Sequence, residues 1–204
     1  MLRNTFRRRR TILKRKYDYA GQRTRAISGS VRLNGHVLPP TGLMTGRFDL
    51  ADEPTTYLAD SEDTSMYEAV FRRDVHSVRL QRLKQRFLAT FETIRRLRVA
   101  DLRGLEEEHP VLQSARYLYT QEFALDCRRR GLGGILYASA QHANHGCICL
   151  FKSGISKMDR LAVTPLVSSS QQLHRAVVRA ARAFRLILRA GNLSAAHRLP
   201  PNVR

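Results

Sequence analysis

The apolar residues of this chain are divided among many short segments, and these segments are of two kinds. Apolar runs of strand length predict strands at 87–94, 97–102, 134–139, 147–151 and 161–167. Helical patterns predict helices at 61–71, 76–86, 113–130 and 168–189. The two kinds of segment do not alternate regularly, as they would around a parallel sheet. The chain is therefore predicted to fold as an α+β domain.

The formal net charge of +19 belongs mostly to the two ends of the chain. Residues 1–26 carry a net +9 and residues 175–204 a net +7, whereas residues 27–174 carry only +3. We expect a basic N-terminal extension over 1–26, disordered or loosely helical, a main domain over 27–190 and a tail over 191–204. Because a basic tail attracts any polyanion, nucleic-acid binding through 1–26 and the last helix is an alternative function.

Three observations concern where the protein works. No apolar run approaches the roughly 20 residues that span a bilayer, so no contact with a membrane is expected. The N-terminus lacks the apolar region of a secretory signal, and three cysteines, an odd number, fit a reducing compartment. A cytoplasmic protein is predicted. The Arg-rich start of the chain is also similar to a transit peptide, and the sequence leaves that alternative open.

The helix at 61–71 has a clear start. Ser61 can cap it, and the carboxylates of Glu62 and Asp63 favour the positive end of the helix dipole. Glu68 lies off the centre of the apolar stripe, so it can face a cleft or solvent. The stripe itself consists of Met66, Tyr67, Val70 and Phe71.

The last predicted helix is amphipathic. Ser168–Ser170 can cap its start, and Gly191 can close it, as Gly131 can close the helix at 113–130. Its apolar face consists of Leu173, Val177, Ala181, Phe184 and Leu188. Its arginine face, interpreted as a solvated one, consists of Arg175, Arg179, Arg182, Arg185 and Arg189.

Two blocks of residues indicate chemistry. Gly46–Asp49 is followed ten residues after Arg47 by Tyr57, and then by Glu68. A guanidinium offers paired donors to phosphate oxygens, and a carboxylate can stabilise positive charge that develops on a sugar. The set suits a dinucleotide with a pyrophosphate to bind and a glycosidic bond to break. In the second block, Gly134–Ser139, a serine ends an apolar strand.

Together these blocks resemble the RES domain family, a bacterial family named after its Arg, Glu and Ser residues. The resemblance runs from about Ser28 to Val167. The segments that carry it, each weak alone but specific in their order, are Gly46–Asp49, Thr56–Ala59, Tyr67–Phe71, Val99–Leu102, Tyr119–Gln121, Gly134–Ser139 and Cys149–Phe151.

The resemblance implies a compact α+β fold similar to the ADP-ribosyltransferases of the diphtheria-toxin type. It implies that NAD+ is consumed as a substrate, by hydrolysis or phosphorolysis, with no prosthetic group; some members transfer ADP-ribose to protein. It also implies a toxin restrained by a helix-turn-helix (Xre-type) antitoxin that occludes the site, and a homodimer. The sequence does not decide among water, phosphate and protein as the acceptor of the ADP-ribosyl group.

The resemblance also gives the candidate residues their roles. Glu68 would stabilise the positive charge on the ribose, or orient a ribose hydroxyl or the nucleophile. Arg47 would bind the pyrophosphate, and Tyr57 would stack on nicotinamide or close the pocket around it. Ser139 would hydrogen-bond at the ligand, although no general base stands beside it in the sequence.

In one place the chain departs from the family pattern. The family has an earlier arginine, commonly followed by an aromatic residue, on its first strand. The best counterpart here is Arg32, which is followed by Leu33, and Arg25 is its rival. We expect Arg32 to be the second phosphate-binding arginine. If that arginine is lost, a catalytically silent RES domain that serves as an interaction module is a further alternative.

One segment also carries residues of the kind that bind metal ions. His142, His145, Cys147 and Cys149 are metal-capable residues within eight positions. Their spacing fits neither of the usual paired-ligand arrangements, and Ile148 is expected in the core of the same strand. No metal is predicted. Cys127 is expected to be an unreactive helix residue.

Overall fold

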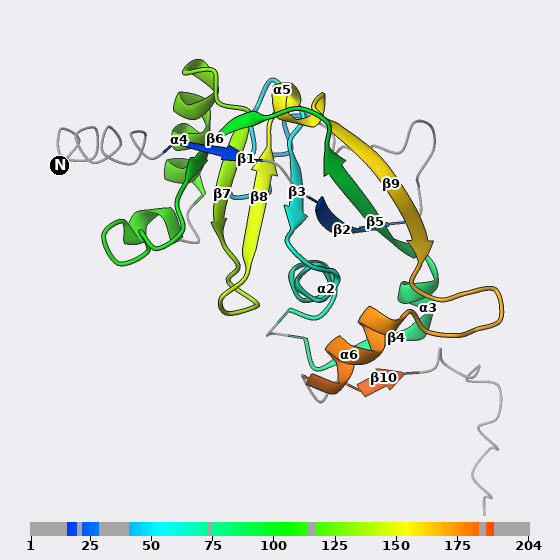
Figure 1. Cartoon of the computed structure of the whole chain (residues 1–204). Coiled ribbons are helices and arrows are strands. Elements are labelled where there is room, and N and C mark those ends of the chain that lie inside the picture. Colours follow the sequence, from blue (N-terminus) through cyan, green and yellow to red (C-terminus); the bar gives the residue numbers. More distant parts are fainter. Residues whose placement is uncertain are drawn as a thin grey trace, which may run out of the picture.

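The structure is a computed structural model that describes residues 16–19, 22–28, 41–72, 75–113, 117–183 and 187–189. Over these residues the chain has a mixed α+β fold, which confirms the predicted fold class. A strongly curved sheet forms the upper part of the molecule, and a smaller group of helices lies below one end of it (Figure 1).

In the described part of the chain, the main sheet has eight strands. Their spatial order is β1 (Lys16–Tyr19), β6 (Leu97–Asp101), β7 (Gly134–Ala138), β8 (Gly146–Leu150), β3 (Thr56–Ala59), β2 (Gln22–Ser28), β5 (Arg86–Thr93) and β9 (Met158–Pro165). Neighbouring strands are antiparallel except β6 and β7, which are parallel. A second, small sheet pairs β4 (Ser77–Arg79) in parallel with β10 (Ile187–Arg189).

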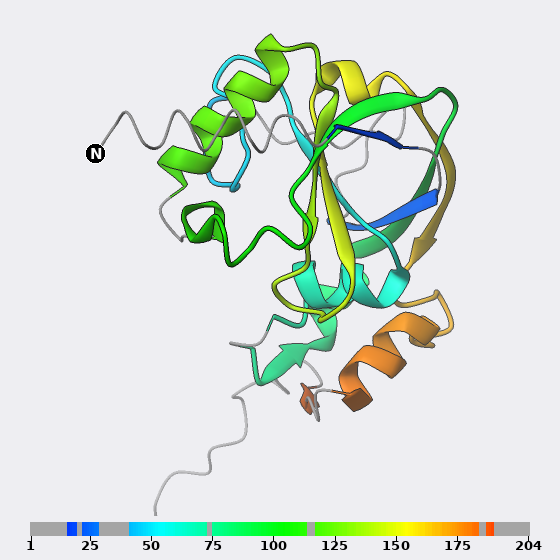
Figure 2. The ribbon, with the colours of Figure 1, turned by 60° about the vertical axis from the view of Figure 1, so that its left-hand side comes forward.

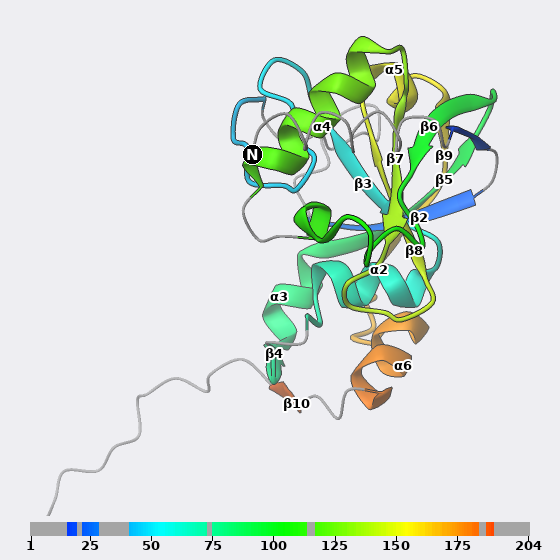
Figure 3. The same ribbon diagram turned by 90° about the vertical axis from the view of Figure 1, so that its left-hand side faces the viewer.

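The helices fall into two groups. Figures 1 and 3 show α4 (Leu118–Arg129) beside β6 and β7, next to the short 3₁₀ helix η1 (Pro110–Gln113). Figure 2 shows α2 (Glu62–Ala69) across the lower end of the sheet, with α6 (Arg175–Ala183) beneath it. In the described ranges, the other helices are α3 (Leu80–Lys84) and α5 (Lys152–Ile155).

The prediction of a disordered or loosely helical arm over 1–26 is wrong for the residues that the structure describes, because 16–19 and 22–26 lie in strands. β1 pairs with β6, with Lys16 opposite Ala100, and β2 lies between β3 and β5 inside the sheet. Charged residues are compatible with such strands because alternate positions point to opposite faces of a sheet. The high charge of this segment therefore led to a wrong prediction for residues that are strands of the main sheet.

Most predicted strands are confirmed, and three helix predictions need correction. The segment expected as a helix at 76–86 begins with β4, because a distant partner, β10, supplies its hydrogen bonds. The helix at 113–130 begins five residues late, at Leu118, and ends before Gly131, which has a φ of 72°. The final helix is described over Arg175–Ala183, and residues 187–189, expected at its end, form strand β10 instead.

The start of α6 also differs from the prediction. Ser168 belongs to a turn, in which its Oγ accepts the backbone N–H of Gln172 at 3.0 Å. An isolated bridge between Val167 and Leu173 follows, and α6 begins only after His174. The Nδ1 of His174 accepts the N–H of Ala176 at 3.3 Å, so a histidine takes the capping position expected for serine.

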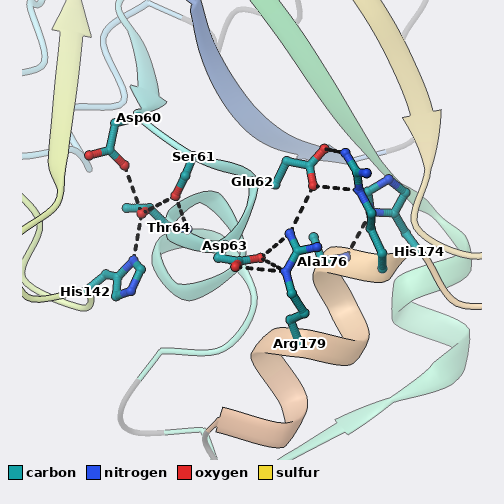
Figure 4. Close-up of polar contacts among 10 residues, drawn as sticks. Asp60, Ser61, Glu62, Asp63, Thr64, His142, His174, Ala176 and Arg179 are labelled. Atoms are coloured by element: carbon teal, nitrogen blue, oxygen red, sulfur yellow. Dashed lines mark hydrogen bonds and ion pairs between the residues drawn. The ribbon is translucent and has the colours of Figure 1, made fainter.

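α2 begins as the sequence predicts. The Oγ of Ser61 accepts the N–H of Thr64 at 3.1 Å, and the stripe from Met66 to Phe71 is buried against α6. Arg179 of α6 donates to Asp63 at 2.8 Å and to Glu62 at 3.2 Å (Figure 4). Burial alone would raise the pKa of Glu62, but hydrogen bonds from Arg175 and Arg179 lower it. The ion pairs thus hold the negatively charged start of α2 against α6.

Two apolar clusters fix the parts of the chain that matter most for the site. One packs α4 against β6, β7 and β8, and it includes Phe48, Phe123 and Phe151, all fully buried. The other packs α2 against α6. No helix within the described ranges is long and apolar enough to cross a membrane.

Replacing Arg179 with Ala is expected to lower the free energy of unfolding by up to about 1 kcal/mol, since exposed ion pairs contribute little. The loss should shrink at high salt, because ions screen surface charges. Urea denaturation at low and high salt measures both effects. Arg182→Ala is the matched control, because Arg182 is an exposed residue of the same helix. An equal loss in the two variants would contradict the ion-pair explanation.

Candidate active site

Arg47 lies in a tight turn that only glycine can begin. The N–H of Gly46 donates to Asp49 Oδ2 at 2.6 Å, and the N–H of Asp49 donates back to the Gly46 carbonyl at 3.4 Å. A Cβ at position 46 would collide with the Asp49 carboxylate and the Tyr57 hydroxyl. The glycine therefore allows the turn to close against β3.

The carboxylate of Asp49 joins this turn to β3. Its Oδ1 accepts from Thr55 Oγ1 at 2.9 Å and from the Tyr57 hydroxyl at 2.8 Å. The same hydroxyl accepts the N–H of Phe48 at 2.8 Å. Burial, and then the nearby Cys149 and Asp49, raise the pKa of Tyr57, so the phenol stays protonated and donates. Tyr57 is thereby fixed in one orientation.

α4 holds the other side of the turn. Gln121 Nε2 donates to the carbonyls of Met44 and Gly46, both at 3.0 Å, and Thr120 Oγ1 donates to the Arg47 carbonyl. The backbone around Arg47 is thus bound by β3 on one side and α4 on the other. The Arg47 guanidinium carbon lies 6.0 Å from the centroid of the Tyr137 ring, within reach of a cation–π interaction.

The side chains converge on a cavity of about 400 Å³. This volume falls within the range of roughly 300–1,000 Å³ usual for ligand pockets. Its charged lining residues are Arg47, Glu68 and Arg72, and its aromatic ones are Tyr57, Tyr117 and Tyr137. A cavity with two guanidinium groups, one carboxylate and several aromatic rings suits a flat, partly anionic ligand.

Glu68 is held by Ser139. The Ser139 Oγ donates to Glu68 Oε1 at 2.5 Å, and it accepts the N–H groups of Gln141 at 3.2 Å and His142 at 2.9 Å. These contacts use the one hydrogen and both lone pairs of the hydroxyl. In this arrangement Ser139 orients the carboxylate and closes the turn after β7.

The structure therefore brings together four of the five predicted site residues. Arg47, Tyr57 and Glu68 line the same cavity. Ser139 lines an adjoining cavity of about 170 Å³, which Arg47 and Tyr137 also line, and its hydrogen bond reaches Glu68. Arg32 lies outside the described residues, and its rival Arg25 belongs to β2, opposite Ala89 of β5.

Tyr137 and Arg72 are among the cavity residues that the sequence did not reveal. Tyr137 lies two positions before Ser139 on β7, and residues two apart share a face of a strand. The period of two along a strand could therefore have identified Tyr137 as a residue on the same face as Ser139. Arg72 lies beyond the end of α2, and only the folded chain brings it to the cavity.

A polar cluster fixes the segment between β7 and β8. The rings of His142 and His145 stack with their centroids 3.7 Å apart, and His142 Nδ1 lies 2.8 Å from Thr64 Oγ1 (Figure 4). Asp60 accepts the N–H of Gly146 at 2.6 Å and lies 3.1 Å from the Nδ1 of His145. Burial, then the charge of His145, lowers the pKa of His142, which favours its neutral form.

The two cysteines considered as metal ligands lie in the core of the sheet. Cys147 and Cys149 are buried in β8, and the Cys149 Sγ points to the Phe48 carbonyl at 3.8 Å. Across the part of the chain that the structure covers, no group of three or more His, Cys, Asp or Glu residues could hold a metal ion. Cys127 is buried in α4, and burial raises the pKa of its thiol.

The comparisons with known proteins agree with this fold. Residues 10–178 match the RES domain family. The fold is similar to that of a chain in the crystal structure of the M. tuberculosis MbcT–MbcA toxin–antitoxin complex, with a TM-score of 0.60 and 15% identity. The similarity covers 86% of this chain and 96% of that chain. No curated protein matches the sequence.

Replacing Tyr57 with Phe is expected to lower the free energy of unfolding by about 1–3 kcal/mol, because Asp49 and the Phe48 N–H lose a buried partner. The ring itself would remain in place. Thermal or urea unfolding measures the change. Tyr119→Phe is the matched control, because Tyr119 is 41% exposed and lies outside the cavity lining. Unchanged stability of Tyr57→Phe would show that the hydroxyl does not hold the turn.

Proposed function

The chain belongs to the RES domain family, and we propose that it is a toxin that cleaves the nicotinamide–ribose bond of NAD+. The observation that carries this proposal is the convergence of Arg47, Tyr57 and Glu68 on one cavity, with Glu68 held by Ser139. Family membership supports the reaction class, and the geometry supports the assignment of roles.

The chemistry required is the breaking of a carbon–nitrogen bond at the ribose. The bonding pair leaves with nicotinamide, whose ring becomes neutral, and positive charge develops on the sugar. A carboxylate beside the sugar stabilises that transition state more than the ground state, in which the charge is on the nicotinamide ring. Glu68 is the only carboxylate among the described residues that line the cavity.

The two oxygens of Glu68 then have different tasks. Oε1 accepts from Ser139, which fixes the plane of the carboxylate. Oε2 would face the ribose or accept the proton of the incoming hydroxyl. Water, phosphate or a protein side chain would add to the sugar carbon and lose that proton. Ser139 thus acts by positioning Glu68 and is not proposed as the nucleophile.

The other side chains would bind the pyrophosphate and the nicotinamide of NAD+. Arg47 would bind the pyrophosphate through paired N–H donors. The ring of Tyr57, locked by Asp49, offers an aromatic face to nicotinamide, whose cationic ring favours such a contact. Tyr137 also lines the cavity, and its ring lies 6.0 Å from the Arg47 guanidinium carbon.

The family also suggests how the toxin is controlled. The similar structure comes from a toxin–antitoxin complex, which supports an antitoxin as the partner of this chain. We propose that this partner is a helix-turn-helix (Xre-type) antitoxin that covers the cavity. We also propose that the protein is a homodimer that acts on the cytoplasmic NAD+ pool, and that its fold is similar to ADP-ribosyltransferases of the diphtheria-toxin type.

The central prediction concerns nicotinamide release. The purified, folded protein is expected to release nicotinamide from NAD+ in water or with added phosphate, as followed by chromatography. Glu68→Gln should slow release by about 100- to 1,000-fold, the usual effect of removing one electrostatic contact to a transition state. Binding of NAD+, measured by calorimetry, should be largely retained, because Gln keeps the shape of Glu.

Glu107→Gln is the control for this experiment, since Glu107 is exposed and does not line the cavity. It should leave the rate unchanged. No release by the well-folded parent protein, in either medium, would refute the proposed reaction. Full release by Glu68→Gln would instead refute only the role of Glu68.

A further inference from the structure

We propose that Asp60 and His142 are positioning residues for Glu68. They act from outside the cavity: through Thr64 they hold the β7–β8 turn, residues 139–145, whose first residue donates to the Glu68 carboxylate. This role rests on the proposed function, in which Glu68 acts on the ribose. Asp60, Thr64 and His142 are absent from the described residues that line the two cavities.

Asp60 joins the start of β8 to the start of α2. Its backbone N–H donates to the Gly146 carbonyl at 3.0 Å, and its Oδ2 accepts the Gly146 N–H at 2.6 Å. Its Oδ1 lies 3.1 Å from the Nδ1 of His145 and accepts from Thr64 Oγ1 at 3.0 Å. Ser61, the next residue, caps α2. One carboxylate therefore connects the end of the β7–β8 turn with the first turn of the helix that carries the candidate catalytic acid.

The hydroxyl of Thr64 has three partners, and a count of its hydrogen and lone pairs fixes the donor in each contact (Figure 4). Burial alone would raise the pKa of Asp60, but the hydrogen bonds that this carboxylate accepts lower it, so it is charged and can only accept. Thr64 therefore donates its one hydrogen to Asp60. Its two lone pairs are left for Ser61 Oγ at 2.7 Å and His142 Nδ1 at 2.8 Å. The Nδ1 atom must then carry a hydrogen, which makes His142 a donor to Thr64.

The β7–β8 turn contacts α2 at two points, one helical turn apart. Thr64 and Glu68 are four residues apart in α2 and so lie on the same side of the helix. His142 meets the hydroxyl of Thr64, and Ser139 meets the carboxylate of Glu68. The ring of His142 also packs edge-on against the ring of Tyr67, with the centroids 4.6 Å apart. The contact at Thr64 therefore sets how the turn lies along α2 at Glu68.

The count of hydrogens and lone pairs also applies at Ser139. Its Oγ accepts the N–H of Gln141 at 3.2 Å and the N–H of His142 at 2.9 Å, which occupy both lone pairs. Its N–H donates to the His145 carbonyl at 2.8 Å, so the turn is closed on itself. The hydroxyl hydrogen then has one direction left, toward Glu68 Oε1. A displacement of His142 would remove one of the N–H groups that impose this direction.

The charge of His142 affects these contacts. Its ring is stacked on that of His145, with centroids 3.7 Å apart and planes 8° apart. The other charged or titratable groups that face it are Asp60, Asp63 and Tyr67, which lie on α2 or just before it. Burial, then the charge of His145, lowers the pKa of His142, so the folded protein favours the neutral ring. Two positive charges on stacked rings would repel each other, so acid is expected to loosen the turn.

The test compares two substitutions of His142 in the release of nicotinamide from NAD+. His142→Leu removes the donor to Thr64, and kcat should fall by about 10- to 100-fold, because a small misplacement of a catalytic group is costly. KM and the Kd of ADP-ribose should stay within about twofold, since other side chains bind the ligand. His142→Asn keeps a donor nitrogen near the place of Nδ1 and should recover most of kcat. Equal losses in the two variants, or a parental kcat in a folded His142→Leu protein, would overturn the proposal.

Asp60→Asn tests the other end of this chain of contacts. An amide group accepts hydrogen bonds on its oxygen alone, so Gly146 or Thr64 loses its acceptor. We expect kcat to fall at least about tenfold while KM changes little. Asp159→Asn is the matched control, because Asp159 is an exposed residue of β9 outside the cavity lining, and it should leave kcat unchanged. A folded Asp60→Asn protein with the kcat of the parent would remove Asp60 from the proposal.

The acid side of the pH profile is a further readout. Because the pKa of His142 is lowered in the folded protein, the stabilisation from its neutral ring is complete above the ordinary value of 6.5 and is lost as the pH falls through the lowered value. The kcat of the parent should therefore fall on acidification, and that of His142→Asn, which has no ring to protonate, should fall less. His76→Asn is the control, because His76 is exposed and outside the cavity lining. Identical acid profiles in the parent and in His142→Asn would count against the role of His142.

The two proposals fail in different ways. A parent protein that releases no nicotinamide would refute the proposed reaction. The hydrogen bond from Ser139 to Glu68 can then still be examined in crystals, where it should be absent in His142→Leu and present in His142→Asn. Its persistence in both variants would overturn the positioning role, whether or not the parent protein is an active enzyme.

Discussion

The antiparallel pairing of β3 with β8 is the constraint on which the site depends. Thr56 of β3 lies opposite Leu150 of β8, across more than ninety positions of sequence. The turn that leads into β3 carries Arg47, and the helix that leaves β3 carries Glu68. β8 is in turn paired with β7, whose end carries Ser139. The pairings of β3 with β8 and of β8 with β7 therefore bring the three candidate segments together around the cavity and its neighbour.

Two hydrogen-bonded carboxylates convert this coarse arrangement into a defined geometry, and they do so in different ways. Both carboxylate oxygens of Asp49 accept hydrogen bonds from the protein, namely from Gly46, Thr55 and Tyr57. This carboxylate therefore stabilises the turn. Glu68 receives its protein hydrogen bond, from Ser139, on one oxygen. A carboxylate that is oriented through one oxygen can use its other oxygen to act on a ligand. This contrast separates a structural acid from a candidate catalytic one more clearly than their sequence positions do.

The sequence was sufficient for the features that depend on local patterns. The cap at Ser61, the stripe from Met66 to Phe71 and the end of α4 at Gly131 follow from neighbouring residues alone, and the structure confirms them. The convergence of Arg47, Tyr57 and Glu68 was predicted through the family resemblance. β4 and β10 were beyond reach, because each is a strand only through the other, across more than one hundred positions. Arg72 was missed for a similar reason.

The distribution of charge also has a different meaning once the fold is known. The N-terminal charge was interpreted as an extension outside the domain, yet 16–19 and 22–28 are strands of the main sheet. On α6, Arg175 and Arg179 pair with Glu62 and with Asp63 at the start of α2. Part of the positive charge thus stabilises the helix that carries Glu68. The net charge of a chain therefore does not by itself identify a polyanion-binding surface, because part of that charge is used in ion pairs between elements of the same chain.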